Sequence, residues 1–417
     1  MTDGALESPR LRAVEAFPVQ QNGRRLIALR DPAGYAAGIV LLPPAAVEVV
    51  RHFDGRHSLV DIQAEIMRRL GELVPRADIE QLAAALDEHG FLDSPRFAAR
   101  RRQVDEAFLA SPTRPAAHAG GAYAAEPDVL RRTMDAFFAG PDGPGPVQWD
   151  AGEADARPVA GIIAPHIDFH RGGPAYAWAY RDLAERCPAD IFVILGTCHA
   201  GMPDPFALSR KDWDTPLGTV PVERDFVEAL ARRAGQDCFA SEWAHRQEHS
   251  IEFQAVFLQY LFGGRREVAI VPVLASFAHE AILAGTTPEA DPRVARFLDA
   301  LAETAAASRR PVALVAGADL AHVGPRFGDP EPVSEAGRAA IEREDRAMLE
   351  PVAAGDAAGF FASVAADGDR RRICGLSPIY ALLRLLGGRR GTVRRYGLWP
   401  DPDGVVSYAS VVFDGDA

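Results

Sequence analysis

Two histidines in this chain directly follow short apolar runs. His166 follows the run 159–164 and Pro165, and His199 follows the run 191–195 and three small residues. Buried parallel strands read as continuous apolar runs, and ligands bind beyond the carboxyl ends of such strands. Imidazole is a ligand for iron, copper, zinc and nickel. Two such histidines on neighbouring strands therefore predict a metal site without identifying the metal.

Two further segments present groups of similar chemistry. Asp319 and His322 follow an apolar run, and their spacing of three residues places them on one face if the segment is helical. His322 is then a candidate general acid or base, with Asp319 orienting it or a metal ligand; the alternative is a hydrogen-bonded structural pair. Cys374 precedes a predicted helix that starts near Ser377. A thiol near the start of a helix has a lowered pKa. The simpler interpretation is that Cys374 packs as a small buried apolar residue. We expect all four segments to converge on one metal site.

Other polar residues compete for these roles. Cys198 is the rival of Cys374 as a thiol ligand, but in an extended segment its side chain points away from that of the adjacent histidine. Glu248, His249 and Glu252 lie at the start of the helix predicted over 250–262. Capping and the helix dipole explain carboxylates at such a position. A role in the site stays open for His249 and Glu252. Weaker candidates are Asp168 and His170, which follow His166 closely, and His118, His245 and His279.

The elements that must position these residues alternate between strands and helices from residue 116 to residue 417. Strands are expected at 159–164, 191–195, 268–274, 312–318 and 407–413. Helices are expected at 127–138, 175–186, 223–234, 250–262, 291–307, 333–353 and 377–386. Such alternation predicts an α/β fold with a largely parallel central sheet flanked by helices.

A small separate domain is predicted over residues 13–95. Strands at 26–29 and 38–42, helices at 45–53, 59–70 and 78–89, and a short strand at 91–92 indicate a winged-helix-like α+β module. Ser58 is a candidate cap for the second helix, and Gly90 closes the third. Residues 96–115 form a linker, with a charged helix that Pro112 interrupts.

Composition and charge exclude several classes of function. The chain has 417 residues and a net charge of −13, which argues against general binding to nucleic acid or anionic membranes. No apolar run approaches the roughly 20 residues of a membrane helix, and residues 1–12 lack the apolar core of a signal peptide. We therefore expect a cytoplasmic protein whose four cysteines are free thiols.

Eight short segments occur in a fixed order from residue 116 to the end: His118-Ala119-Gly120, Ala164-Pro165-His166, Leu195-Gly196-Thr197-Cys198-His199, Thr215-Pro216-Leu217-Gly218, Glu248-His249-Ser250-Ile251-Glu252, Val271-Pro272-Val273-Leu274, Asp319-Leu320-Ala321-His322 and Ile373-Cys374-Gly375. In these segments and their order the chain resembles the Memo-like family, whose bacterial member is called AmmeMemoRadiSam system protein B. Residues 13–95 weakly resemble PqqD-like peptide-recognition domains; a module without peptide binding is the alternative.

The resemblance implies a fold similar to class III extradiol dioxygenases (LigB-like), which use non-haem Fe(II). By the family pattern, His166, His199 and Cys374 match the metal-binding positions, and Asp319 and His322 line the site as the residues expected to act in catalysis. The dioxygenases have a carboxylate where Cys374 stands, and a soft thiolate shifts the preference towards copper(I). The implied cofactor is therefore one copper or iron ion. Residues 167–170 depart from the family's Ala-Gly-Tyr and make the site more polar.

Three functions from different classes follow from these features. The first is a metal-dependent redox enzyme with dioxygenase-related activity at a His/His/Cys site. The second is a non-catalytic copper-binding protein. The third is a non-catalytic partner of a radical SAM enzyme and an AMMECR-type protein, in which residues 13–95 recruit a peptide or protein.

Overall fold

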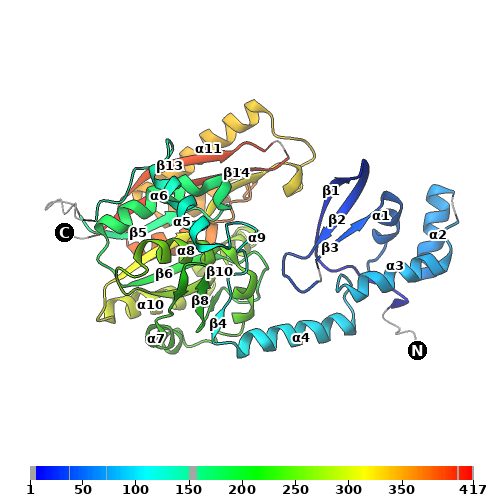
Figure 1. Ribbon diagram of the computed structural model, residues 1–417, viewed down its shortest axis with the longest axis horizontal. Helices are drawn as coiled ribbons and strands as arrows, with labels where there is room; N and C mark the ends of the chain where they lie inside the picture. Colours follow the sequence, from blue (N-terminus) through cyan, green and yellow to red (C-terminus); the bar gives the residue numbers. More distant parts are fainter. Residues whose placement is uncertain (1–5, 37, 72, 150–156, 402, 416–417) are drawn as a thin grey trace. The chain divides into compact units, whose positions relative to one another are not determined.

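The chain divides into two units, residues 1–110 and 111–417, each with its own apolar core. A computed structural model describes residues 6–36, 38–71, 73–149, 157–401 and 403–415 (Figure 1). Within these ranges no helix is both long enough and apolar enough to cross a membrane.

The first unit opens with a three-stranded antiparallel sheet in the order β1-β2-β3. β1 (Glu15–Gln21) and β2 (Arg24–Arg30) are joined by Asn22-Gly23, both with positive φ, as a tight hairpin turn requires. β3 (Ile39–Leu42) pairs with β2. The sequence predicted β2 and β3 but missed β1, because Pro18 and a mostly exposed face hide its alternation.

Four helices follow this sheet. They are α1 (Pro44–Val50), α2 (Leu59–Leu70), α3 (Arg76–Glu88) and α4 (Pro95–Ala110). The predicted cap at Ser58 is confirmed, since its hydroxyl accepts the backbone N–H of Asp61 and the Asp61 carboxylate accepts in return. The predicted strand at 91–92 is reduced to one bridge between Leu92 and Leu11. The unit is α+β, as predicted.

The second unit is built on an eight-stranded mixed sheet in the order β12-β14-β5-β11-β6-β10-β7, with β13 paired to β14. Its four inner strands are parallel: β5 (Val159–Ala164), β11 (Val312–Gly317), β6 (Ile191–Thr197) and β10 (Ala269–Ala275). Their nearly continuous burial matches the apolar runs in the sequence. The outer strands are antiparallel: β14 (Val405–Asp414), β12 (Asp319–Val323), β13 (Gly391–Trp399) and β7 (Phe206–Leu208).

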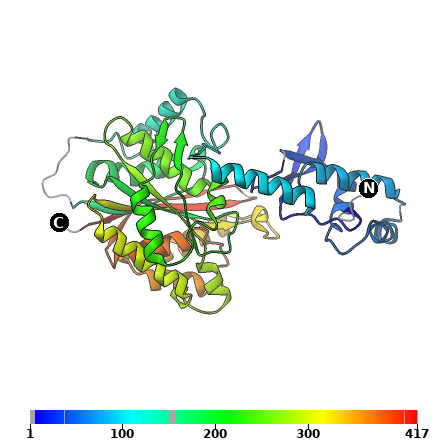
Figure 2. The ribbon, with the colours of Figure 1, turned by 90° about the horizontal axis from the view of Figure 1, so that it is seen from below.

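Helices cover both faces of this sheet (Figure 2). α5 (Pro127–Ala139), α6 (Phe169–Arg186) and α8 (His249–Phe262) lie on one face, and α10 (Pro292–Ala307) and α13 (Leu376–Leu386) on the other. The remaining elements are β4 (Thr113–Arg114), β8 (Asp212–Thr215), β9 (Gly218–Val220), α7 (Arg224–Ala234), α9 (Ala278–Leu283), α11 (Glu335–Ala354), α12 (Ala357–Ala365) and three short 3-10 turns near the ends of these elements.

The α/β fold class is confirmed, with two differences from the predicted detail. The strand predicted at 407–413 is antiparallel to β5, so the sheet is parallel only in its inner part. The segment 319–322 is extended, not helical, because it pairs with β14. Neither pairing is visible in the local sequence, since both join strands that lie far apart along the chain.

Candidate metal centre

His166 is held at the end of β5 by two hydrogen bonds. Its backbone N–H donates to Asp319 Oδ1 (2.9 Å), and its Nδ1–H donates to the carbonyl of Gly317 (2.9 Å). Because a carbonyl only accepts, the ring proton sits on Nδ1 and the Nε2 lone pair is free. Burial, and then the neighbouring His199, lower the pKa of His166 to about 3. The ring is therefore neutral at pH 7 and able to bind a cation.

His199 lies two residues beyond β6 and is bound twice by one carboxylate. Its backbone N–H donates to Glu248 Oε2 (2.8 Å), and its Nδ1–H donates to Glu248 Oε1 (2.9 Å). Burial acts to lower the pKa of His199, but the carboxylate overcomes this effect and the net shift is upward. Burial likewise acts to raise the pKa of Glu248, but His199 takes it well below its usual range. This arrangement fixes the tautomer and leaves Nε2 of His199 free.

His249 is brought to these two histidines by a pair of glycines. Gly196 on β6 and Gly317 on β11 are direct neighbours in the sheet. A Cβ on Gly196 would lie 2.5 Å from Ser250 Oγ, and one on Gly317 would lie 2.3 Å from the Ser250 carbonyl oxygen. Only glycine therefore lets the first turn of α8, which begins at His249, rest on the strand ends.

Hydrogen bonds fasten this turn of α8 to both strands. Ser250 Oγ donates to the carbonyl of Thr197 (2.9 Å), at the end of β6. Gln254 Nε2 donates to the carbonyl of Pro165 (2.8 Å), just beyond β5. The start of α8 is thereby fixed relative to the segments that carry the other two histidines.

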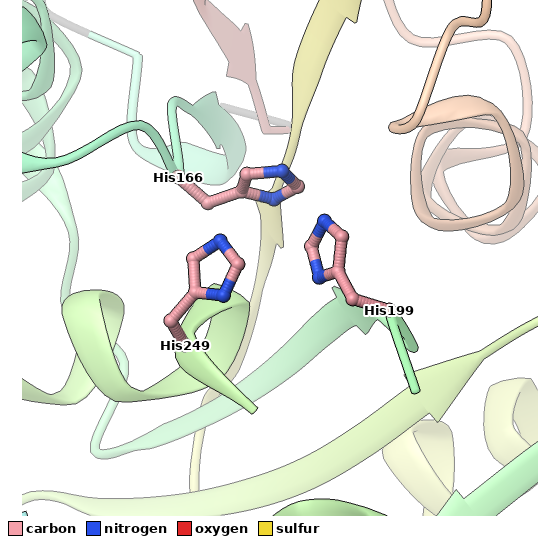
Figure 3. Close-up of side chains that lie close together, drawn as sticks. All are labelled: His166, His199 and His249. Carbon is pink, nitrogen blue, oxygen red and sulfur yellow. The ribbon is translucent and has the colours of Figure 1, made fainter. Parts of the chain in front are cut away.

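The three imidazoles point towards one another (Figure 3). Ring centroids are 4.9 Å apart for His166 and His199, 5.2 Å for His166 and His249, and 4.4 Å for His199 and His249. One nitrogen of each ring lies within 4.8 Å of the others. Burial, with His199 second, lowers the pKa of His249 well below its usual range. The cluster thus gathers three ring nitrogens where a single ion can be shared.

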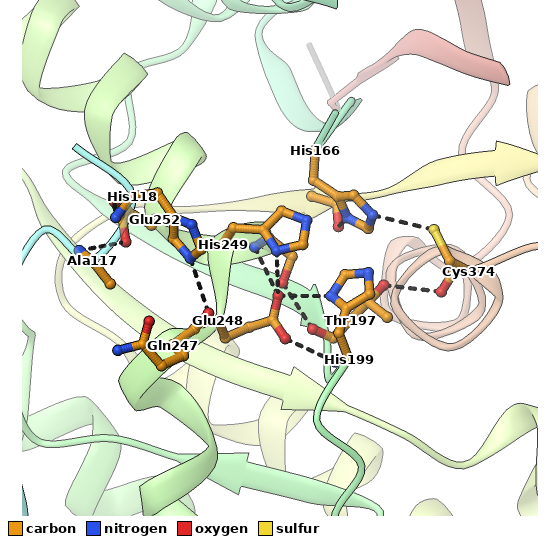
Figure 4. A network of polar contacts seen from close by, with 12 residues as sticks. Ala117, His118, His166, Thr197, His199, Gln247, Glu248, His249, Glu252 and Cys374 are labelled. Atoms are coloured by element: carbon orange, nitrogen blue, oxygen red, sulfur yellow. Dashed lines mark hydrogen bonds and ion pairs between the residues drawn. The ribbon is translucent and has the colours of Figure 1, made fainter. Parts of the chain in front are cut away.

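Cys374 lies beside His166 (Figure 4). Its Sγ is 3.2 Å from His166 Nε2, and with the ring proton on Nδ1 the thiol donates to that nitrogen. The expected lowering of the thiol pKa near the start of α13 is wrong: burial, and then Asp319, raise the pKa of Cys374. The helix end is outweighed because a buried thiolate beside a carboxylate is unfavourable.

Asp319 and His322 both approach the cluster from β12. Asp319 Oδ2 is 3.7 Å from His166 Nε2, and Nδ1–H of His322 donates to the carbonyl of Leu320 (3.1 Å). A bulge lies between the two residues, because three steps on β12 match two on β14. The extra residue returns both side chains to one face of an extended strand, where regular pairing would separate them. The pair therefore converges for a reason other than the predicted helix.

Glu248 connects His199 and His249 (Figure 4). It caps α8 by accepting the backbone N–H of Ser250 at Oε1 (3.0 Å), and the same oxygen lies 3.5 Å from His249 Nδ1. Capping, predicted for this residue, is confirmed, and the same carboxylate also orients His199. A neighbouring buried carboxylate, Glu252, pairs with Arg114 and accepts the backbone N–H of His118 (3.0 Å).

The other candidates lie apart from the three-ring cluster or at its margin. At the margin, the ring of His118 is 5.5 Å from that of His249, and Asp168 pairs with Arg171 (2.6 Å). Elsewhere, His245 Nε2 bonds the carbonyl of Ala207, His279 pairs with Asp369, His170 is exposed beside Trp399, and Cys198 is a buried free thiol. All four cysteines are free, as predicted.

The donor atoms suit a transition-metal ion. His166 and His199 each donate Nδ1–H to an acceptor and turn Nε2 towards the cluster, which is the usual arrangement of metal-binding histidines. For typical metal–nitrogen and metal–sulfur bonds, two neighbouring ligand atoms of one ion lie ~3.1–3.6 Å apart. The Sγ–Nε2 distance of 3.2 Å falls within this range. Imidazole and thiol together suit copper, iron or zinc better than magnesium or calcium.

His249 is the site residue that sequence reasoning left undecided. Its position at the start of a helix favoured a capping explanation, and the capping residue is the adjacent Glu248. The signal that was available is the pair of strand-end glycines, Gly196 and Gly317. Both glycines make room for the first turn of α8.

Comparison with known proteins gives one consistent result for the second unit. The profile of the family described as Memo-like protein matches residues 114–412. A MEMO1 family protein of Methanopyrus kandleri is 32% identical over 309 residues, which cover 71% of this chain and 96% of the relative.

Other relatives extend into the first unit. A MEMO1 family protein of Aquifex aeolicus is 29% identical over 405 residues, covering 96% of this chain and 99% of the relative. A MEMO1 family protein of Thermus thermophilus is 29% identical over 347 residues, covering 83% of this chain and 94% of the relative. The Aquifex alignment is long enough to include most of residues 1–110.

Proposed function

Because this chain belongs to the Memo-like family, we propose that it binds one copper or iron ion and carries out a metal-dependent redox reaction related to that of dioxygenases. The ligands are His166, His199 and His249, with Cys374 as a further donor. The observation that carries the proposal is the three-ring cluster whose nitrogens lie within 4.8 Å of one another.

The donor set is compatible with copper or iron, the two metals that the family resemblance implies. Imidazole serves both metals, and a thiolate adds a preference for copper(I). The thiol is neutral without a metal, and a bound cation favours its ionised form. Cys374 is therefore the residue that decides between the two metals.

An ion held by these residues would supply electron transfer and would activate a substrate as a Lewis acid. The chain itself supplies two titratable groups beside the histidine cluster. Burial lowers the pKa of His322 to about 4, so the ring is neutral at pH 7, and because its Nδ1–H is bonded to Leu320, its Nε2 can accept a hydrogen bond. Burial raises the pKa of Asp319 to about 6, which allows this carboxyl to hold or release a proton near neutral pH.

Metal analysis and metal titration test this proposal. Protein purified without added metal should contain about one copper or iron ion per chain, and His249→Ala should weaken binding at least ~10-fold. His89→Ala, which removes an exposed histidine of the first unit, is the matched control and should bind like the natural protein. Unchanged metal affinity in His249→Ala would overturn the three-histidine set. Turnover of a phenolic or small redox substrate only when the ion is bound distinguishes an enzyme from a copper-binding protein without activity.

A second candidate function concerns the first unit. β3 pairs only with β2 in the described sheet, and Ile39 and Leu41 are 55% and 37% exposed along this edge. An extended peptide can add a strand to such an edge. We propose that residues 13–95 recruit a segment of a radical SAM or AMMECR-type partner protein. Peptides tiled from these partners should bind the full chain and lose affinity with Ile39→Asp, whereas no binding by any tile would refute the proposal.

A further inference from the structure

The segment that carries Cys374 has an unusual backbone. Residues 366–375 join α12 to α13 without regular structure. Asp369 (φ 57°) and Arg372 (φ 54°) are two of the three non-glycine residues with positive φ in the part of the chain that the structure describes. A positive φ is unfavourable for a residue that carries a Cβ. Surrounding contacts must therefore hold the segment in place.

The contact best suited to this task is a buried ion pair. Arg371 is 5% exposed, and its Nη1 donates to Oδ1 of Asp345, which is fully buried on α11. Its Nε lies 3.3 Å from Glu344. Removing one partner of a buried pair leaves an uncompensated charge, which is strongly destabilising. Arg371 therefore cannot leave Asp345 without a large loss of stability.

This ion pair closes a ring of hydrogen bonds with β12. Asp345 Oδ2 accepts from Ser407 Oγ (2.5 Å), and Ser407 Oγ accepts the backbone N–H of Ala321 (2.9 Å). The next residue, His322, donates its backbone N–H to the carbonyl of Arg371 (2.7 Å). The ring thus joins two consecutive residues of β12 to the segment that precedes Cys374.

Two more bonds transmit this placement to the thiol. Gly375 donates its backbone N–H to the carbonyl of Asp319 (3.0 Å), and Thr197 Oγ1 donates to the carbonyl of Cys374 (2.9 Å). A Cβ on Gly375 would lie 2.5 Å from the Asp319 carbonyl oxygen, so this approach is as close as a glycine permits. Cys374 is therefore fixed between β12 and the end of β6.

We propose that Arg371 and Asp345 are positioning residues that hold the Cys374 sulfur against His166. Neither residue contacts the three-histidine cluster, and their effect on it passes through the backbone of residues 371–375 and through β12. The effect of this pair on metal binding rests on the proposed metal site, whereas its effect on the placement of the thiol rests only on the hydrogen bonds described above.

Two variants test the inference, each followed by two measurements. Arg371→Met with Asp345→Asn removes both charges, which buried pairs tolerate better than the loss of one. Arg371→Lys keeps a cation beside Asp345, and thus the fold, but removes the planar fork. The first measurement is the alkylation rate of Cys374 in the apo protein by mass spectrometry, with the buried Cys187 as internal reference. The second is the sulfur-to-metal charge-transfer band with cobalt(II) as the only added metal.

Both variants should alkylate Cys374 several-fold faster and weaken the charge-transfer band, the double variant more strongly. The matched control is Arg12→Met with Asp31→Asn, a nearly buried Arg–Asp pair of the first unit, which should change neither measurement. Natural values for both measurements in Arg371→Lys, or in the folded double variant, would overturn the inference. If the natural protein itself binds no cobalt(II), the proposed metal site fails, and the alkylation rates still decide whether the pair positions the thiol.

Discussion

Replacing Glu248 by Gln should weaken metal binding while the chain stays folded. The carboxylate is 3% exposed and accepts three N–H groups at two oxygens. Two come from His199, one to each oxygen, and the third comes from the backbone of Ser250. A Gln side chain has one accepting oxygen and one donating NH2 group. Whichever way it is turned, its NH2 faces an N–H donor at one of these positions.

The size of the effect follows from these bonds. Hydrogen bonds to a charged group contribute ~1.5–3 kcal/mol each, and the substitution removes at least one of them together with the charge that favours the Nδ1–H tautomer of His199. A loss of ~1.4–2.7 kcal/mol corresponds to a ~10–100-fold weaker metal affinity. We expect this range for Glu248→Gln.

The assay is competition of the protein with a chelator for cobalt(II) or copper(I), with thermal unfolding as a check on the fold. Glu242→Gln is the matched control, because Glu242 is also buried and accepts Ser209 Oγ and the Arg210 backbone N–H at the same oxygen (both 2.9 Å). A Gln can turn its oxygen to that side, so metal affinity should stay unchanged. Natural affinity in Glu248→Gln, or equal losses in both variants, would refute the reasoning.

Three further predictions concern the approach of α8, the thiols and pH. Gly317→Ala places a Cβ 2.3 Å from the Ser250 carbonyl oxygen and should displace the start of α8. Metal affinity should fall at least ~10-fold in the same competition assay, and the free energy of unfolding should fall by ~1–3 kcal/mol. Natural values of affinity and stability would contradict this prediction. Cys374→Ser should reduce copper(I) affinity more than iron(II) affinity, whereas Cys198→Ser should leave both unchanged; equal copper loss in the two variants would exclude Cys374 as the specific donor. Burial lowers the pKa of His245 from 6.5 to about 4, so the unfolded chain binds the extra proton below pH 6.5. This residue's contribution to stability is full above pH 6.5 and is lost as pH falls towards 4, by up to ~3 kcal/mol. Denaturant unfolding of His245→Gln should therefore show a shallower loss over that range, and identical slopes would contradict the assignment.

Much of the second unit was predictable because short sequence patterns, such as apolar runs, determine where its inner strands form. Every predicted strand from 159–164 to 312–318 lies within a residue or two of an observed one, since buried parallel strands need continuous apolar runs. The positions of His166 and His199 followed, because such strands end where a ligand site forms. Ser58 was predictable as a cap for the same local reason.

The exceptions depend on contacts between distant segments. β14 pairs with β12, β13 and β5, and the local sequence pattern of a strand does not indicate which strands will be its neighbours. The pKa of Cys374 was predicted in the wrong direction, because the proximity of a helix end is visible in the sequence but burial beside Asp319 is not. Asp319 and His322 share a face through a bulge, which also requires the partner strand.

By itself the sequence determined that two histidines stand at strand ends, that a thiol precedes a late helix, and that an α/β sheet connects them. Only the tertiary structure decided that His249 completes the cluster. That outcome depends on Gly196 and Gly317 lying side by side on β6 and β11, which are separated along the chain but adjacent in the sheet. Because these two glycines have no side chain, α8 can approach the strand ends. The sequence alone does not show this role, since it depends on which helix packs against the two glycines.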